Sequence, residues 1–404
     1  MHKIGSFFSS LKLTIILLAC AMVLIFFGTL DQVDYGIYEV QKRYFASFFT
    51  IWHYPLQWPG SNFLSWIILP LPGGYLLTTL LVINLLAAHF RYFVLRWSKI
   101  GIAFIHLGIL MLIISGVISS LLQSESQMML TQDKPVSYSQ VTRENELVII
   151  DTTDPNQLQT HTISEKTLRS SSIIPISNTP LSIKLEKFYP NSDIGLRSQN
   201  PEVKEKSLAT QGAGVKMDIV VFPKPVSYKE DEANGVTAYV TVLGRDEETQ
   251  SLDDIGTWLV STIIDERFPA QKFSFAHKSY EIALRPKRIY FPFSLKLLKF
   301  NHDLYPGTDI PRNFSSLVEI INPAKVANRT VLIYMNNPLR YEGYTFYQAS
   351  YAGKNSVLQV VKNPGWLLPY FSVLLVALGL TFHFFLYLFK YLTKTHQHSS
   401  IPQN

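Results

Sequence analysis

Cysteine is nearly absent from this 404-residue sequence, which holds only Cys20. Without a second cysteine the chain forms no intramolecular disulfide, and it supplies neither a dithiol reductant nor a thiolate metal site. Familiar catalytic motifs are lacking as well: the sequence has no nucleophile elbow, phosphate-binding loop, HExxH motif or CxxC pair. We therefore expect no catalysis by this chain alone.

Charge is also scarce, since charged residues make up 16% of the chain and the formal net charge is +6. Lysine and arginine do not gather in a long run, and many of them flank apolar segments instead. The sequence therefore does not predict a basic face that would hold a phosphate backbone, and we exclude nucleic acid as a partner.

Apolar residues, by contrast, are abundant, making up 47% of the chain, and most of them lie in four runs. A helix needs about 20 apolar residues to cross a bilayer, so each run predicts a transmembrane helix in contact with lipid. These helices are predicted at residues 13–30, 64–88, 100–122 and 364–392. A signal peptide is the alternative for the first run, but it lacks a small-residue cleavage site and further spans follow.

The charges that flank these runs predict the orientation of the chain. Basic residues near the span ends mark the cytoplasmic side, and four crossings place all of them on one side. They are Lys3, Lys12, Arg91, Arg96, Lys99, Lys390 and Lys394. Residues 31–62 and 123–363 are then exterior, and residues 393–404 form a cytoplasmic tail that we expect to be disordered.

The long segment 123–363 has the sequence of a β-rich domain. Short β-branched and aromatic stretches alternate with Pro, Gly, Asn and Asp, which is typical of many short strands. The expected fold is therefore four membrane helices with a β sandwich or open barrel between the third and fourth. Within the domain we predict one short helix at 258–268 and a polar loop or poorly ordered insert at 190–214.

Histidines inside the predicted spans are the strongest candidates for function, because an ionisable residue is costly in lipid. His106 and His383 each lie seven residues, or about 10 Å, from the flanking lysine, which predicts a shared depth. His106 is either a haem axial ligand or a histidine that hydrogen-bonds a neighbouring helix. Gly108 beside it lets a planar macrocycle or a partner helix approach. His89 ends the second span and is interpreted as interfacial.

Several motifs along the chain resemble those of one family. The first span is bracketed by SLKL at 10–13 and GTL at 28–30, and the third carries HLG at 106–108 and SG at 115–116. Longer stretches follow: LRPKRIYFPF at 284–293, HDLYPGT at 302–308, FSS at 314–316, MNNPLRY at 335–341, GYTFYQASY at 343–351 and NPG at 363–365. In this order, ending at a terminal transmembrane helix, they resemble the ResB family, also called CcsB, a membrane component of system II cytochrome c biogenesis.

The resemblance implies a bacterial cytoplasmic membrane protein with its large domain on the periplasmic side. It also implies a CcsA-like membrane partner, with which ResB-like proteins move haem b across the membrane and attach it to apocytochrome c. This chain lacks the Trp-rich segment of CcsA, so the ligation chemistry is expected in the partner. A transmembrane histidine of the family is held to bind haem, and His106 matches it best. His383 is the candidate for a second ligand.

Motif positions in the exterior domain carry turn and strand chemistry, such as proline and glycine in turns and alternating residues along a strand. We interpret them as structural rather than as contacts with haem or peptide. They are Tyr305, Gly307, Thr308, Asn336, Pro338, Tyr341, Gly343 and Gln348.

Two other functions remain as rivals. One is a membrane-anchored scaffold or adhesion protein with no cofactor, in which the histidines only pack. The other is a transporter subunit, which four spans without an inverted repeat disfavour.

Overall fold

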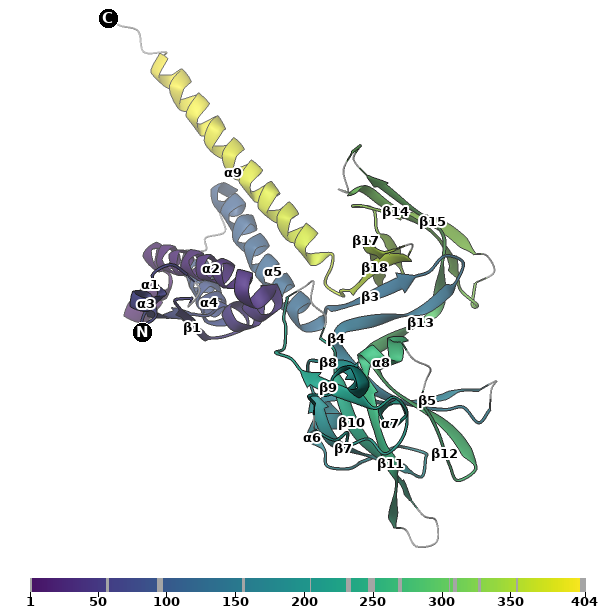
Figure 1. The fold of residues 1–404 in the computed structure, drawn as a ribbon. Helices are drawn as coiled ribbons and strands as arrows, with labels where there is room; N and C mark the ends of the chain where they lie inside the picture. The colour runs from purple at the N-terminus through teal and green to yellow at the C-terminus, as the bar shows by residue number, and fades with distance from the viewer. Residues whose placement is uncertain are drawn as a thin grey trace, which may run out of the picture. The chain divides into compact units, whose positions relative to one another are not determined.

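A computed structural model describes residues 2–55, 58–92, 97–154, 157–203, 205–229, 234–245, 251–267, 271–304, 306–307, 311–325, 328–353 and 355–399. The chain divides into two units. The first consists of residues 1–123, 228–232 and 363–404, and the second of residues 124–227 and 233–362. Long helices build the first unit, and strands build the second (Figure 1).

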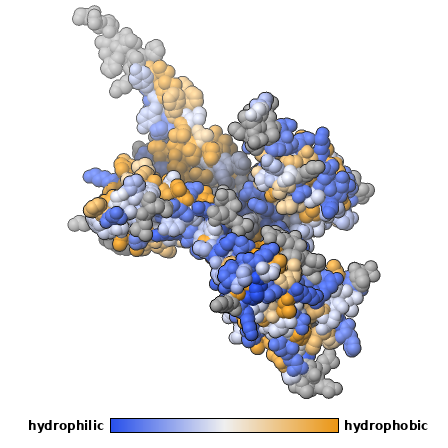
Figure 2. All heavy atoms as spheres, in the orientation of Figure 1, coloured by the Kyte–Doolittle hydropathy of each residue, from blue (hydrophilic) through white to orange (hydrophobic). Residues whose placement is uncertain are grey.

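Among the described residues, four helices are long and apolar enough to cross a membrane, which confirms the predicted number. They are α2 (Leu11–Val40), α4 (Gly74–Tyr92), α5 (Ile100–Leu122) and α9 (Leu368–Ser399). The short helix α1 (His2–Phe8) precedes them, and a 3-10 turn, η2 (Trp97–Lys99), precedes α5. The chain is a multi-pass membrane protein, and Figure 2 shows hydrophobic residues over much of α5 and α9.

The second membrane helix begins at Gly74, later than the predicted residue 64. The connection from α2 contains, in order, the π-helical turn η1 (Gln41–Phe45), β1 (Phe49–His53), α3 (Ser61–Leu64) and β2 (Ile68–Pro72). Strands β1 and β2 pair antiparallel. Pro70 and Pro72 lack a backbone N–H and clash with a helical turn, so this apolar stretch forms a strand rather than helix.

The first membrane helix extends beyond the predicted 13–30 but contains a break. Gly36 has a φ of +76°, a conformation that glycine adopts without a steric penalty. The chain then returns along α2, and a Cβ added at Gly28 would lie 3.7 Å from the ring of Tyr44. The hydroxyl of Tyr44 donates a hydrogen bond of 2.6 Å to the buried carboxylate of Asp31.

Helices α5 and α9 pack closely through small residues (Figure 1). A Cβ added at Gly101 would lie 2.7 Å from the carbonyl oxygen of Gly379, and one at Gly108 would lie 2.8 Å from that of Ser372. Lipid supplies no hydrophobic force between helices, so membrane helices associate through such close backbone contact. We call these contacts the glycine seam.

Helix α9 continues to Ser399, so residues 393–399 of the predicted tail are helical in the structure. Residues 391–399 contain neither glycine nor proline, so their sequence gives the helix no reason to stop. Residues 400–404 lie outside the described part of the chain.

The second unit confirms the expected β-rich fold. Its strands are β3 (Ser124–Leu130), β4 (Pro135–Asp151), β5 (Gln159–Ser164), β6 (Ile174–Pro175), β7 (Leu181–Tyr189), β8 (Ser192–Leu196), β9 (Ile219–Pro223), β10 (Thr237–Arg245), β11 (Leu252–Ser261), β12 (Gln271–Phe275), β13 (Lys278–Leu304), β14 (Pro311–Ile321), β15 (Arg329–Tyr334), β16 (Leu339–Tyr341), β17 (Tyr344–Ala352) and β18 (Asn355–Lys362). Short helices and turns connect them: α6 (Glu165–Ser170), η3 (Arg197–Gln199), α7 (Ala213–Lys216) and α8 (Thr262–Arg267).

Two large hydrophobic cores organise these strands, and a smaller cluster contains Ile219 and Leu259. A sheet of order β11-β10-β7-β6 covers the first core, which it shares with β5, β4, β13 and β12, so this half is a sandwich. The second core lies inside a nearly closed barrel of order β15-β14-β13-β4-β3-β18-β17-β16. An isolated bridge between Tyr334 and Asn337 connects the two ends of that order. The long strands β4 and β13 take part in both halves (Figure 1).

Two local predictions for this unit need correction. The helix expected at 258–268 is shorter, since Trp258 lies in strand β11 and α8 covers only Thr262–Arg267. The end of β11 is buried on both faces, and a continuous apolar run does not distinguish strand from helix. The segment 190–214, expected to be loop or insert, contains strand β8, which pairs with β9.

Candidate functional site

Two histidines face each other across helices of the first unit. His89 lies in the last turn of α4 and His106 in the second turn of α5. Their ring centroids are 6.2 Å apart, the ring planes are inclined by 59°, and both side chains are half-buried. Sequence reasoning set His89 aside as interfacial. The structure therefore gives His106 a neighbour that spacing along the chain did not reveal.

A metal at this pair would have to be one that is already held by a macrocycle. Among the described residues, no three His, Cys, Asp or Glu side chains gather where they could hold a bare metal ion. Haem supplies its own equatorial nitrogens, and neutral imidazole is a standard axial ligand. The 6.2 Å between the ring centres of His89 and His106 brings two imidazoles together between α4 and α5.

A buried asparagine fixes helix α4 five residues before His89. Asn84 donates hydrogen bonds from Nδ2 to the carbonyl oxygens of Phe8, at 2.6 Å, and Ser10, at 3.2 Å. Its Oδ1 accepts a bond of 2.6 Å from the hydroxyl of Thr14. These bonds satisfy an amide that is 3% exposed and tie α4 to the start of α2. A polar residue inside an apolar run was the available signal for this anchor.

The glycine seam fixes helix α5 on its other side. Gly108 was expected to admit a macrocycle or a partner helix, and helix α9 of the same chain occupies that space. A Cβ added at Gly108 would lie 2.7 Å from the Val376 side chain. His106 is thus held on a helix with neighbours on two sides, α4 and α9.

His383 does not share the level of His106 on α5. Its Cβ lies only 3.0 Å from where a Cβ of Gly101 would be, and Gly101 precedes His106 by five residues, or roughly 7–8 Å of helix. The equal-depth expectation counted from Lys390, but α9 continues well beyond that residue. The ring of His383 lies 4.6 Å from that of Tyr387, and its Nδ1 is buried with no hydrogen-bond partner among the described residues.

The motif positions of the β-rich unit lie in turns and on strands. Tyr305 and Thr308 fall outside the described residues. Three others have a positive φ: Gly307 (76°), Asn336 (63°) and Gly343 (79°). Glycine and asparagine adopt this conformation most readily, which accounts for their presence in these turns. Pro338 directly precedes strand β16.

Two further motif residues make contacts inside the barrel half. Gln348 accepts a hydrogen bond of 2.6 Å from Ser316 and donates one of 3.2 Å to Ser356, so it links β14, β17 and β18. Tyr341 packs edge-on against Phe293, with ring centroids 4.8 Å apart. These contacts are internal to the unit and favour the structural interpretation of both residues.

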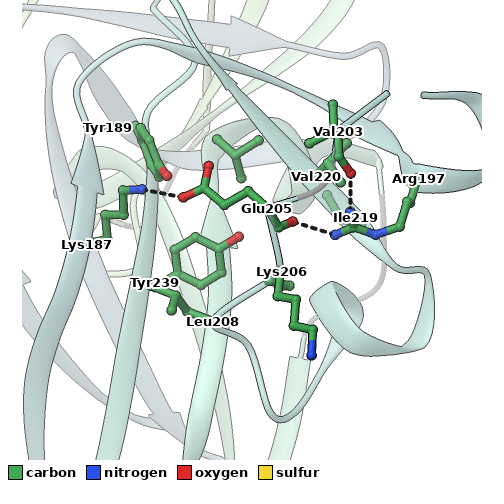
Figure 3. Close-up of a pocket in the computed structure, with 12 residues that line it drawn as sticks. Lys187, Tyr189, Arg197, Val203, Glu205, Lys206, Leu208, Ile219, Val220 and Tyr239 are labelled. Carbon is green, nitrogen blue, oxygen red and sulfur yellow. Dashed lines mark hydrogen bonds and ion pairs between the residues drawn. The ribbon is translucent and has the colours of Figure 1, made fainter. Parts of the chain in front are cut away.

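A shallow hollow opens on the β-rich unit near β7, β9 and β10 (Figure 3). Three of its charged side chains already have partners: Lys187 donates to Glu205 at 3.1 Å, and Arg197 donates to the backbone carbonyl oxygens of Val203 and Glu205. Burial raises the pKa of the Tyr239 phenol in its wall. With these charges already paired, the hollow gives no argument for a ligand.

Comparison with known proteins agrees with the motifs. Residues 260–357 match the model of the ResB-like family. Over 178 residues the chain is 30% identical to Protein NrfI from Wolinella succinogenes, a match that covers 44% of this chain and 19% of that protein. The chain therefore spans about a fifth of the length of that relative.

Comparison with solved structures adds no argument about the family. The structure of human GIVD cytosolic phospholipase A2 in complex with methyl gamma-linolenyl fluorophosphonate aligns over 60% of this chain and 33% of that one, at 10% identity. Its TM-score of 0.09 carries no argument about the fold. The family match runs from the end of β11 to the start of β18, and the longer sequence motifs between residues 284 and 351 lie within it. The chain thus contains a ResB-like segment, which confirms the resemblance to the ResB family.

Proposed function

We propose that this protein is a ResB-like component of a cytochrome c maturation complex and that His106 is an axial ligand of haem b within the membrane. The facing pair of His89 and His106 is the observation that carries this proposal. The ResB resemblance supplies the rest: a CcsA-like membrane partner, apocytochrome c as the acceptor, and a periplasmic position for the β-rich unit. Ligation is assigned to the partner, and this chain is a non-catalytic subunit.

In this proposal haem is the cargo that the complex moves and attaches. The chain's own residues hold it in place. His106 supplies a neutral imidazole nitrogen, and the position of that imidazole is set by the glycine seam on one side of α5 and by α4 on the other. His89 has one of two roles: second axial ligand, or hydrogen-bond partner that orients His106.

The test is to purify the full chain with a CcsA-like partner and record the haem absorption spectrum. His106→Ala should abolish or shift the spectrum and block cytochrome c maturation. Added imidazole should restore part of both, because free imidazole occupies a vacated coordination position but does not replace a packing contact. His53→Ala, at an exposed position of β1, is the matched control and should change neither. An unchanged spectrum in His106→Ala at normal protein level would show that this histidine only packs.

Two further variants separate the roles of the neighbouring histidines. His89→Ala should convert a six-coordinate spectrum to a five-coordinate one if His89 is a ligand, and should only shift the band if it orients His106. His383→Ala should be nearly silent, because His383 lies at the level of Gly101 rather than of His106. A loss of haem in His383→Ala equal to that in His106→Ala would return His383 to the ligand set.

A further inference from the structure

The connection between α2 and α4 has an unusual outer face. In the β1–β2 hairpin, Thr50, Trp52 and Leu71 point inward and are 5–6% exposed. Trp52 and Leu71 lie in a cluster with side chains of α2 and α4. The alternate residues point outward, and all of them except His53 are apolar.

This outer face, with the turn that joins the two strands, is an exposed apolar surface that we call the hairpin face. Its members and their exposed fractions are Phe49 (73%), Ile51 (48%), Phe63 (81%), Trp66 (75%) and Ile68 (57%). A soluble two-stranded sheet normally turns polar residues to water. Several large apolar side chains exposed on one short segment indicate a contact with something other than water.

Charge narrows the choice of that contact. Residues 41–73 contain no Asp or Glu, and their only Lys and Arg are Lys42 and Arg43. Such a segment offers no carboxylate that anionic lipid headgroups would repel. It also contains three tryptophans, and tryptophan is enriched where a protein meets the membrane–water interface.

The backbone of the hairpin suits the interface as well. Edge strands are excluded from the hydrocarbon core because their free N–H and C=O groups find no partners there. Here Arg43 donates a 2.9 Å hydrogen bond to the carbonyl of Ile51 on β1. On β2, Pro70 and Pro72 have no N–H to satisfy. The hairpin therefore exposes fewer unpaired backbone groups than an ordinary edge.

We infer that the hairpin face binds the lipid bilayer, lying in the headgroup and upper acyl region of the leaflet where α2 ends and α4 begins. The hairpin is continuous with both membrane-spanning helices, which brings it to that surface. The connection between the first two spans is thus a membrane-interface element rather than an aqueous loop. This assignment does not depend on haem binding by the chain.

The test places spin labels on the full chain in vesicles of phosphatidylcholine and phosphatidylglycerol. Cys20→Ala removes the native cysteine, and single cysteines are introduced as Ile51→Cys and Phe63→Cys. Collision rates with oxygen, which concentrates in lipid, and with a water-soluble nickel chelate then report depth. Leu121→Cys on α5 is the lipid control, and Thr162→Cys on β5 is the aqueous control; both native side chains are exposed.

Both hairpin labels should collide several-fold more often with oxygen than with nickel, as the Leu121→Cys label does. Nickel collision rates equal to those at Thr162→Cys would place the face in water and overturn the assignment. Low rates with both reagents would overturn it in another way, because they would show that a protein surface, either a second copy or a partner, covers the face.

Discussion

The glycine seam holds two membrane helices together, and the barrel core holds strands together, but the two do so by different kinds of packing. In the seam, backbones of α5 and α9 approach so closely that a methyl group at Gly379 would lie 2.6 Å from a carbonyl oxygen. In the barrel, large side chains such as Phe293 and Phe346 fill the space between strands. Lipid replaces water around the first and not the second, so burial of apolar area stabilises the barrel but contributes little between membrane helices.

The largest loss of stability should come from removing a large side chain from the barrel core. Phe346 is fully buried against Phe291 and Phe293, and Phe346→Ala should lower the free energy of unfolding of the β-rich unit by about 3–5 kcal/mol. Denaturant titration of the full chain in detergent, followed by dichroism of the strands, measures it. Tyr347→Ala is the control, since its side chain is 38% exposed on the opposite face. Equal losses in both variants would contradict a core built on inward-facing aromatics.

The glycine seam should be destabilised by a larger side chain, because its glycines leave no space for one. Gly379→Ala puts a methyl group against Gly101 and the backbone of Ile105, and we expect a loss of about 1–3 kcal/mol. Thermal unfolding in detergent and cysteine cross-linking of α5 to α9 report it. Gly116→Ala on α5 meets nothing within 4 Å and should leave both measurements unchanged. A tolerated Gly379→Ala would mean that the helices are not held by close contact.

Acid should weaken one ion pair of the β-rich unit. Burial alone would raise the pKa of Asp151, but hydrogen bonds from Thr153 and the ion pair with Lys278 at 3.2 Å outweigh it and lower that pKa. The stabilisation is complete above the ordinary aspartate pKa of about 3.9 and is lost as pH falls through the lower folded value. Asp151→Asn should lower the midpoint of thermal unfolding by roughly 2–4 °C at neutral pH. That difference from the native chain should vanish in acid, and a difference independent of pH would assign it to packing.

The smallest effect should follow removal of one hydrogen bond between membrane helices. Thr14→Val keeps the shape of the side chain but removes its 2.6 Å bond to Asn84. Interhelical hydrogen bonds in membranes contribute on average about 0.6 kcal/mol, so thermal unfolding in detergent should shift only slightly. Asn84→Leu, which removes the whole set of bonds, should cost more. A large loss from Thr14→Val alone would show that polar contacts rather than close packing dominate this unit.

Composition and periodicity predicted the four membrane helices and the β-rich region because each pattern is local. A run of about 20 apolar residues identifies a span without knowledge of its neighbours. Residues 68–72 were misassigned because they are as apolar as a span, and only Pro70 and Pro72 reveal the strand. Trp258 was placed in a helix because burial on both faces of a strand removes the alternation that distinguishes it.

The candidate site shows the same division. His106 could be selected from sequence, because a histidine in an apolar run is costly wherever it faces. Its neighbour could not, because the contact with His89 depends on how α4 and α5 cross, and no local pattern records that. Counting from the flanking lysines predicted equal depth for His383 and His106. This count fails because α9 continues beyond Lys390, and His383 lies beside Gly101 rather than beside His106.

Strand β13 gives the β-rich unit a particular kind of cooperativity. Its 27 residues place Ile282 and Leu284 in the sandwich core and Phe293 and Leu295 in the barrel core. If β13 unfolds in one half, the other half loses the core side chains that β13 contributes to it. Local unfolding or mechanical force at one end of β13 is therefore transmitted along its continuous backbone to the other end. The sandwich half and the barrel half should unfold together in a single transition rather than as separate modules.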